Sequence, residues 1–463
     1  MEGYELLRRH IMLSKKRIII SLLVVLIAAS VMAGGNKAAG STATSSGKIN
    51  LTVLNYTDLT VANAAAFEKW QWETFLANNP DVTIQKEDLF DEPFHEKTAA
   101  YAASGNLPDI LYVWPAGRSS LLHQNHLLKD LAPFIQKDNL KSKFLPVCID
   151  PSQQGAGYLA MIPQALTATN AMFVNLDVLN ACGLQPAKTY AEMKAQVPVL
   201  KAKGYETLIM PCKDTWVMQS CLFSAIAGRF GGEGWEKDIL SGKTKFTDSN
   251  FVAALDFIKQ LYADGVLLPS ALGIDYGEGP GLFATDKSAY YVDGDWRVGD
   301  FITDQDTGIA LLDVNKQKNI KVTIFPAIDG AKINNNNSTV LGTGWAMNAS
   351  IPAGSAKEDA AWRLVKWLSG PEVETRMLQN GGISAPSRTD IDVTKLNLEP
   401  LQIAMVNFGN QYQVGTCVID DKFEGDVYNP INDGLVELGL GSKTPAQIAA
   451  SAQQALATWQ ASK

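Results

Sequence analysis

Segments with strand periodicity alternate with segments of helical periodicity from residue 49 onward, and this alternation constrains the fold more than any other feature of the chain. Apolar and polar residues alternate over 49–53, which is typical of a strand with one buried face. A helical stretch follows and ends at the Asn-Asn-Pro sequence of residues 78–80. Further strands are predicted from Val82 and over 109–113. Strands that alternate with helices predict a mainly parallel sheet covered on both faces.

The pattern restarts after a loop around residues 155–157. Strands are predicted over 171–174 and 207–210. Between them, Thr189 and Glu192 form the capping box that begins a helix. A second series of strands and helices implies a second lobe.

A late helix has clear start and stop signals. Ser355 and Glu358 predict a capping box, and apolar residues then recur at helical spacing. Gly370 and Pro371 are expected to end this helix.

The N-terminus is typical of a secretory signal peptide. Basic residues 15–17 precede an apolar run over 18–29, and small residues at 31 and 33 suggest cleavage after Ala33. Residues 1–33 are therefore predicted to be removed, and residues 34–48, small and polar, to be a flexible linker. The alternative is an uncleaved signal anchor. No cysteine lies near the cleavage site to support lipid attachment.

Charge limits the partners. The formal net charge is −8, and it becomes more negative without the basic leader. Nucleic acid and anionic membranes demand clustered positive charge, so neither is expected as a partner. A chain of 463 residues is expected to form two or more domains.

The five cysteines do not suggest redox chemistry. None belongs to a CxxC pair, and an odd number leaves at least one thiol unpaired. Cys212 and Cys221 could pair in an oxidising compartment. We expect the cysteines to be small buried residues.

Several segments, in order, resemble one family. They are SGNLPDILYVW (104–114), the crossover segment 162–193, SAYYVDGDW (288–296), GTGWAMNAS (342–350) and GGISAPSRTD (381–390). In sequence and spacing they resemble the extracellular solute-binding proteins of sugar-type ABC importers, the group that includes maltose-binding protein. The resemblance covers roughly residues 49–460.

The resemblance implies an α/β fold of the periplasmic-binding-protein type II class, with two lobes joined by hinge strands and a ligand cleft between them. It implies an N-terminal lobe of residues 49–160 plus 350–384. It implies a C-terminal lobe of residues 161–349 plus 385–463.

A sugar site needs aromatic rings for the sugar faces and fixed polar groups for the hydroxyls. In open α/β sheets such residues lie after the carboxyl ends of strands. Tyr56 and Asp58 follow the first strand, and similarity to the family implies that Asp58 accepts hydrogen bonds from hydroxyls; the alternative is a turn-capping aspartate. Trp114 and Arg118 follow the third strand, where the family can carry a stacking Trp and a hydroxyl-binding Arg. Packing of that Trp on its own lobe is the alternative.

The second lobe offers candidates in the same position relative to its strands. Asp214 and Trp216 follow the strand over 207–210. Asp295 and Trp296 close the GDW turn, where the family's Trp stacks on the ligand.

Other residues are less clearly placed. Tyr428 stands where maltose-binding protein holds a stacking Trp, and Trp345 either lines the cleft or packs in the core. Arg388 is expected to form a salt bridge. His123 and His126 are three residues apart, but no third ligand is evident, so no metal and no cofactor are expected.

The predicted function is the substrate-binding subunit of an ABC importer, a monomer that captures a sugar by lobe closure outside the cytoplasm and delivers it to membrane permease subunits. No nucleophile elbow, HExxH, P-loop or GxGxxG motif is present, so we do not expect an enzyme. Three alternatives stay open: the same fold with a polyol or glycerophosphodiester ligand, a secreted glycan-active enzyme on a similar frame, and a surface adhesin.

Overall fold

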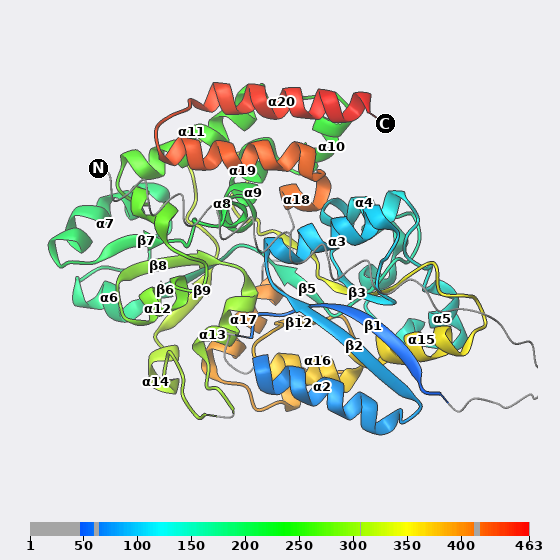
Figure 1. Ribbon diagram of the computed structural model, residues 1–463. Helices are drawn as coiled ribbons and strands as arrows, with labels where there is room; N and C mark the ends of the chain where they lie inside the picture. Colours follow the sequence, from blue (N-terminus) through cyan, green and yellow to red (C-terminus); the bar gives the residue numbers. More distant parts are fainter. Residues whose placement is uncertain (1–46, 60–63, 306, 412–416, 463) are drawn as a thin grey trace, which may run out of the picture. The chain divides into compact units, whose positions relative to one another are not determined.

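The computed structural model describes residues 47–462, apart from residues 60–63, 306 and 412–416 (Figure 1). The predicted signal peptide, residues 1–33, and almost all of the predicted linker lie outside the described residues. Within the described part of the chain, no helix combines the length and apolar character needed to cross a bilayer.

The first strands form a five-stranded sheet. β1 (Ile49–Tyr56) lies between β2 (Val82–Leu89) and β3 (Ile110–Val113), and both neighbours run parallel to it. β11 (Gly344–Met347) and β4 (Ile162–Pro163) extend the sheet through antiparallel pairings, giving the order β2-β1-β3-β11-β4. The three predicted strands are confirmed. Because β4 is antiparallel to β11, it runs in the same direction as β1, β2 and β3, so this sheet is mainly parallel as expected and β11 is its reversed strand.

Two helices from distant parts of the sequence pack on this sheet. Trp72 and Phe75 of α2 (Ala64–Asn78) share a hydrophobic core with Leu364 and other residues of α15 (Ala356–Leu368). Side chains repeating at helical spacing on each helix produce these buried stripes.

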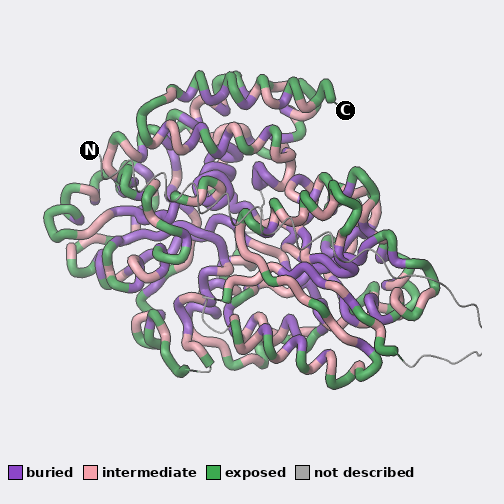
Figure 2. Tube along the Cα trace, viewed as in Figure 1, coloured by how far each residue is buried: buried purple, intermediate pink, exposed green. Residues whose placement is uncertain are grey.

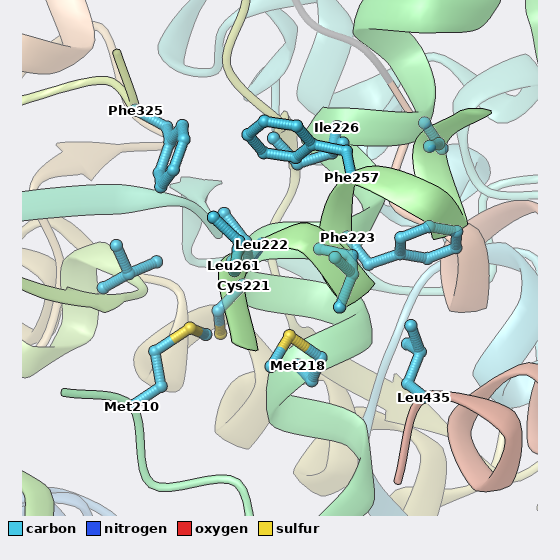
Figure 3. Packing of buried hydrophobic residues seen from close by; sticks show 14 of the residues in the cluster. Met210, Met218, Cys221, Leu222, Phe223, Ile226, Phe257, Leu261, Phe325 and Leu435 are labelled. Carbon is cyan, nitrogen blue, oxygen red and sulfur yellow. The ribbon is translucent and has the colours of Figure 1, made fainter. Parts of the chain in front are cut away.

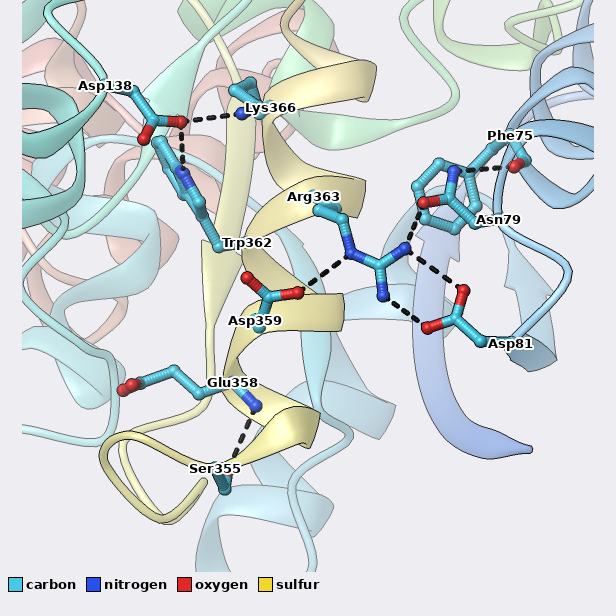
Figure 4. Close-up of polar contacts among 10 residues, drawn as sticks. All are labelled: Phe75, Asn79, Asp81, Asp138, Ser355, Glu358, Asp359, Trp362, Arg363 and Lys366. Carbon is cyan, nitrogen blue, oxygen red and sulfur yellow. Dashed lines mark hydrogen bonds and ion pairs between the residues drawn. The ribbon is translucent and has the colours of Figure 1, made fainter. Parts of the chain in front are cut away.

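Polar contacts fix α15 to its surroundings (Figure 4). Arg363 forms a 2.7 Å ion pair with Asp81 and a 3.0 Å ion pair with Asp359 on its own helix. On another side of the helix, the Trp362 indole N–H and the Lys366 ammonium both donate to Asp138, at 3.0 and 2.6 Å. Exposed pairs of this kind contribute little stability individually, but together they hold the helix in one orientation.

The second sheet is also mixed. Its order is β7-β8-β6-β9, formed by Glu206–Ile209, Ser288–Asp293, Ala171–Asn175 and Ile320–Thr323 respectively. β7 runs parallel to β8, whereas β6 is antiparallel to both β8 and β9. Alternation of strands and helices does not specify from which end a strand enters a sheet, so the sequence pattern left these directions undetermined.

The largest hydrophobic core covers this second sheet (Figure 3). A continuous helical segment supplies its centre: α8 (Thr215–Met218), a π-helical turn (Gln219–Phe223) and α9 (Ser224–Gly231). Met210, Met218, Phe257 and other labelled side chains pack around Cys221 and Leu222. α11 (Ser249–Ala263), α19 (Gly425–Gly439) and α20 (Pro445–Ala461) add further faces to the core. Figure 2 shows the result, with buried strands and helices whose outer faces are exposed.

A small third sheet links the two large sheets. Its order is β10 (Thr339–Leu341), β5 (Ala165–Ala168) and β12 (Ala385–Pro386), all antiparallel neighbours. β5 connects β4 of the first sheet to β6 of the second, and β10 leads directly into β11. We call this the hinge sheet. The predicted lobe boundaries stay a proposal, and the pairing of β11 with β3 favours moving residues 344–349 into the N-terminal lobe.

The remaining helices are mostly short. They are α3 (Glu92–Ser104), α4 (Ser120–Gln124), α5 (Ala132–Lys137), α6 (Leu176–Ala181), α7 (Tyr190–Ala202), α10 (Trp235–Leu240), α12 (Gly279–Ala284), α13 (Val298–Phe301), α14 (Val314–Gln317), α16 (Pro371–Gln379), α17 (Pro400–Gln411) and α18 (Ile419–Lys422). Single 3₁₀ turns occur at Ala116–Ser119, Lys141–Lys143, Pro146–Ile149, Pro151–Gln153, Pro269–Gly273, Asp295–Arg297 and Val393–Lys395.

The predicted helix caps are largely confirmed. Thr189 and Glu192 form the full capping box at the start of α7. Ser355 accepts from the Glu358 N–H at 3.1 Å, but the Glu358 carboxylate accepts from Gly354 instead, so the second box is half-formed.

The structure also decides two side-chain predictions. All five cysteines are free thiols, so the possible bond between Cys212 and Cys221 is not formed. Both of these side chains are buried in the core of the second sheet. Arg388 forms the expected salt bridge, with Asp390 at 2.8 Å.

Candidate functional site

A cavity of about 410 Å³ is lined by residues from both large sheets and from the hinge sheet. Binding sites for small molecules commonly enclose about 300–1,000 Å³. The lining residues lie mainly on loops after β1, β2, β3 and β8, and on the hinge strands β5 and β10. The ends of several strands therefore converge on one space, as the rule for open α/β sheets predicts.

Seven of the ten predicted site residues line this cavity. They are Tyr56, Asp58, Trp114, Arg118, Trp216, Asp295 and Trp296. The reasoning that placed candidates directly after strands thus gathered residues that are far apart in the chain.

Aromatic rings form the wall contributed by the first sheet. Tyr56 ends β1 and Trp114 follows β3, and their rings meet edge to face with centroids 4.8 Å apart. Tyr112 also lines the cavity and stacks on Tyr56 at 5.8 Å. Because β1 and β3 are parallel neighbours, their carboxyl ends bring these rings together. Tyr112 was missed, although it precedes Trp114 by two residues and so shares its side of the strand.

The tyrosine hydroxyls of this wall stay neutral. Burial raises the pKa of Tyr112 to about 12, and burial also raises the pKa of Tyr56. The Tyr112 hydroxyl lies 2.5 Å from the hydroxyl of Thr343 on the hinge side of the cavity. Neutral hydroxyls can both donate and accept, which suits them to bind a ligand that does the same.

The wall from the second sheet also consists of rings. Trp216 lies 4.9 Å from Tyr276 and 6.4 Å from Trp296, measured between centroids. The Trp296 indole N–H donates to the Tyr276 hydroxyl at 2.5 Å. A Cβ on Gly294 would lie 2.2 Å from the Trp296 ring, so only glycine lets the indole lie against this turn. Tyr276 was missed because no strand precedes it.

Trp114 and Trp296, one from each wall, are both half-buried, and both line the cavity. Each therefore keeps part of its ring available to an occupant of the cavity. Trp114 also packs on Phe94 and His95 of its own lobe, as the alternative from the sequence expected, so its stacking on a ligand stays a prediction.

Asp295 connects this cavity to the hinge. Its carboxylate accepts from the Ser384 hydroxyl at 2.5 Å, just before β12, and from the Ala168 backbone N–H at the end of β5. Burial raises the pKa of Asp295 to about 6, although these hydrogen bonds favour the ionised form. The side chain lines the cavity and is also part of the hinge structure.

Arg118 lies in the cavity wall but is already bound by protein groups. Its Nε donates to Asp420 of α18 at 2.8 Å, and its Nη1 donates to His95 Nε2 at 2.8 Å. The side chains of the ion pair are only 11% and 9% exposed. Burial lowers the pKa of His95 to about 3, so the imidazole is neutral and can accept this bond. These contacts hold the guanidinium in place in the cavity wall, and its role of binding sugar hydroxyls stays a prediction.

Asp91 also lines the cavity, although it was not predicted from the sequence. It precedes α3 with φ 56° and ψ −148°, a conformation that non-glycine residues rarely adopt. Burial raises the pKa of Asp91 to about 6, and the nearby charges of Asp214 and Glu92 add to the shift. Backbone strain of this kind is concentrated at functional sites. Asp91 follows the strand that begins at Val82 just as Asp58 follows the first strand, so the rule that selected Asp58 could have found it.

Three predicted residues do not line the cavity. Trp345 is 2% exposed and packs in the core of the first sheet, as the core-packing alternative expected. Tyr428 lies beside Arg118, whose guanidinium carbon is 5.9 Å from the tyrosine ring centre. Asp214 caps the start of α8 without a side-chain hydrogen bond to that helix.

Comparison with known proteins identifies a family and a relative in sequence. A model of the family described as bacterial extracellular solute-binding protein matches residues 64–396. The chain is 26% identical over 306 residues to the maltotriose-binding protein of Pyrococcus abyssi (strain GE5 / Orsay), a match that covers 65% of this chain and 59% of that protein. The match thus spans less than two thirds of the relative's length.

Solved structures of other proteins have the same fold as this chain. A chitin oligosaccharide binding protein has a TM-score of 0.79 at 21% identity, covering 89% of this chain and 98% of the other. A structure from work on xylan utilization by the thermophilic bacterium Caldanaerobius polysaccharolyticus has a TM-score of 0.77 at 22% identity, covering 88% and 99%. The fold is that of type II periplasmic binding proteins, two α/β lobes joined by hinge strands around a cleft. On the match of its family model and on this fold, the chain belongs to the bacterial extracellular solute-binding proteins.

Proposed function

We propose that this protein is the substrate-binding subunit of an ABC importer and that it captures a saccharide in the cavity between its two sheets. The observation that carries the proposal is the pair of aromatic walls, with Trp114 and Tyr56 on one side and Trp216 and Trp296 on the other. Sugar rings present C–H faces that pack on aromatic rings and a rim of hydroxyls that need polar partners. The neutral tyrosine hydroxyls and the carboxylates of this cavity supply such partners.

The names of similar proteins support a saccharide as the class of ligand. A maltotriose-binding protein is a relative in sequence, and a chitin oligosaccharide binding protein is similar in structure. Their ligands differ from each other, so they support the class of ligand and not one particular sugar.

Capture would occur by closure of the lobes. A ligand that touches both walls favours the state in which the walls are close together. Two direct contacts already join the two sides: Arg118 binds Asp420 at the cavity wall, and the Gln124 amide donates to Glu424 outside the cavity lining. These contacts connect segments after β3 to the α18–α19 region. The closed protein would then deliver its ligand to the permease subunits of the importer.

The proposed location is outside the cytoplasm, after export directed by residues 1–33. We propose further that the protein holds its ligand without altering it and acts as a monomer. Family membership agrees with a binding role.

A thermal-shift screen with mono- and oligosaccharides tests the ligand class. We expect at least one saccharide to raise the unfolding temperature, because a ligand that binds only the folded state stabilises it. The same mixtures should contain no new products after prolonged incubation. A saccharide that is cleaved, or a complete lack of response to the panel, would contradict the proposal.

Replacing Trp296 with alanine tests the assigned wall. We expect the affinity for the saccharide found in the screen to fall at least about tenfold, or about 1.4 kcal/mol, because the ring area that would cover a sugar face is lost. Isothermal titration calorimetry measures this effect. Trp70→Ala is the matched control, since Trp70 is also half-buried but packs on Trp367 outside the cavity. Equal affinity in Trp296→Ala and the wild type would refute the site.

A further inference from the structure

Acidic side chains outnumber basic side chains in the lining of the cavity. Among the described residues, the lining contains two arginines, Arg118 and Arg297, and seven aspartates and glutamates. This imbalance matters only if the arginines are already neutralised, so their partners decide what the cavity can bind.

Arg118 has little capacity left for an anion. Its Nε donates to Asp420 and its Nη1 to His95, both at 2.8 Å, and Glu92 lies 3.7 Å from Nη2. Recognition of a carboxylate or phosphate by arginine generally uses two parallel N–H donors. Here Asp420 and His95 already occupy two of the three nitrogens.

Arg297 is bound even more completely. Its three nitrogens donate to Asp293 at 2.9 Å, to Asp300 at 2.8 Å and to the Tyr276 carbonyl at 2.7 Å. The guanidinium also stacks on the Tyr276 ring at 3.6 Å, and the side chain is 4% exposed. The second arginine therefore cannot receive an anionic ligand without breaking internal contacts.

Two carboxylates of the lining are not neutralised in the same way. Asp91 and Asp295 form no ion pair with a cation among the described residues, although the charge of Arg118 acts on Asp91 and Asp295 accepts the Ser384 hydroxyl. Burial raises the pKa of each to about 6, so both are mainly ionised at neutral pH. Asp91 belongs to the first-sheet side of the cavity and Asp295 to the second, so an occupant meets negative charge on both sides.

Resting on the proposed saccharide-binding function, we propose that the cavity accepts neutral and amino-bearing saccharides and excludes saccharides that carry a carboxylate or phosphate, with Asp91 as a residue that sets this selectivity. A carboxylate can accept from a hydroxyl or pair with an ammonium group, but it repels another anion. In a partly buried site this repulsion weakens binding by about 100-fold.

Matched trisaccharides test the proposal. The probes are trimers of glucose, glucosamine and glucuronic acid, each with β-1,4 and with α-1,4 linkages, titrated at neutral pH by calorimetry. We expect binding by a glucose or glucosamine trimer, and at least about 100-fold weaker binding by the glucuronate trimer of the same linkage. A glucuronate trimer that binds as tightly as its glucose counterpart would overturn the selectivity but leave saccharide binding intact. Lack of binding by every trimer would instead count against the proposed function.

Asp91→Asn tests the residue. Asparagine has the same shape as aspartate and replaces only the carboxylate with an amide, so the variant places no new steric demand on this turn. We expect it to reduce the discrimination against the glucuronate trimer by about tenfold or more, because one of the unpaired charges is removed. Asp256→Asn is the control, since Asp256 is exposed on α11 and the change in net charge is identical. Unchanged discrimination in a correctly folded Asp91→Asn would overturn the role of this residue.

Discussion

Breaking the ion pair between Arg118 and Asp420 should weaken ligand binding by separating the two sides of the cavity. The pair is 2.8 Å long, and its side chains are 11% and 9% exposed. Removing one partner of a fully buried pair costs about 3–5 kcal/mol, because the other charge is left without a counterion. Under the proposed closure mechanism, the walls move apart on opening and water then hydrates that charge. We therefore expect a smaller effect of about 2 kcal/mol on closure, which is about 30-fold in Kd.

A double-mutant cycle separates this mechanism from direct contact with the ligand. The variants are Arg118→Met, Asp420→Asn and the combination of both, each titrated with the saccharide that gives the largest thermal shift. If the two residues act as a pair, either single variant loses the whole effect and the double variant is no weaker than the worse single variant. Small-angle X-ray scattering without ligand should show a larger radius of gyration for both single variants.

Lys243→Met is the control for this cycle, because Lys243 forms an exposed ion pair with Asp238 on α10, away from the cavity. Exposed pairs contribute little, so affinity and radius should match the wild type. If the losses of Arg118→Met and Asp420→Asn simply add, Arg118 acts on the ligand independently of Asp420, and the reasoning from the ion pair is wrong.

Two further predictions follow from single residues. Gly117→Ala should lower ligand affinity about tenfold or more without changing the circular dichroism spectrum, because its Cβ would lie 2.4 Å from the carbonyl oxygens of Asp420 and Phe423 and would force α18 away; an unchanged Kd would contradict this. Glu374 is buried and its pKa is raised to about 8, so its contribution to stability is full below about pH 4 and is lost as the pH rises towards 8. Glu374→Gln should therefore flatten the decline in the free energy of unfolding between pH 5 and pH 9, measured by urea titration, by up to about 4 kcal/mol, and an equally steep decline in both proteins would refute this.

Local patterns predicted much of the fold, because they act over short stretches of chain. The alternation over 49–53 does form β1, and Thr189 with Glu192 does begin α7. The same reasoning did not predict the reversed strand β11, which joins the mainly parallel first sheet from a distant segment. That pairing also explains Trp345: within a four-residue strand buried at every position, its side chain enters the core and does not line the cavity.

The candidate site was predictable only where a residue follows a strand. Trp114 and Trp296 satisfy that rule, and both line the cavity. Asp91 satisfies the rule as well, two residues after β2, but was overlooked, whereas Tyr276 follows no strand and is placed by a loop contact. Likewise, no local pattern could show that Arg118 would be bound by a carboxylate from α18, since that pair joins residues that meet only in the folded protein.

Ligand contact and hinge geometry depend on the same residues in this structure. The hinge strands β5 and β10 contribute Leu166, Thr167 and Val340 to the cavity lining, so an occupant touches the segments that connect the two sheets. Asp295 binds the hinge from the second-sheet side through Ser384 and the end of β5. A ligand can shift the open–closed equilibrium only by as much as its binding differs between the two states. Because the hinge strands form part of this cavity wall, a change in hinge angle must alter the contacts made by the occupant, and this supplies the difference in affinity that closure requires.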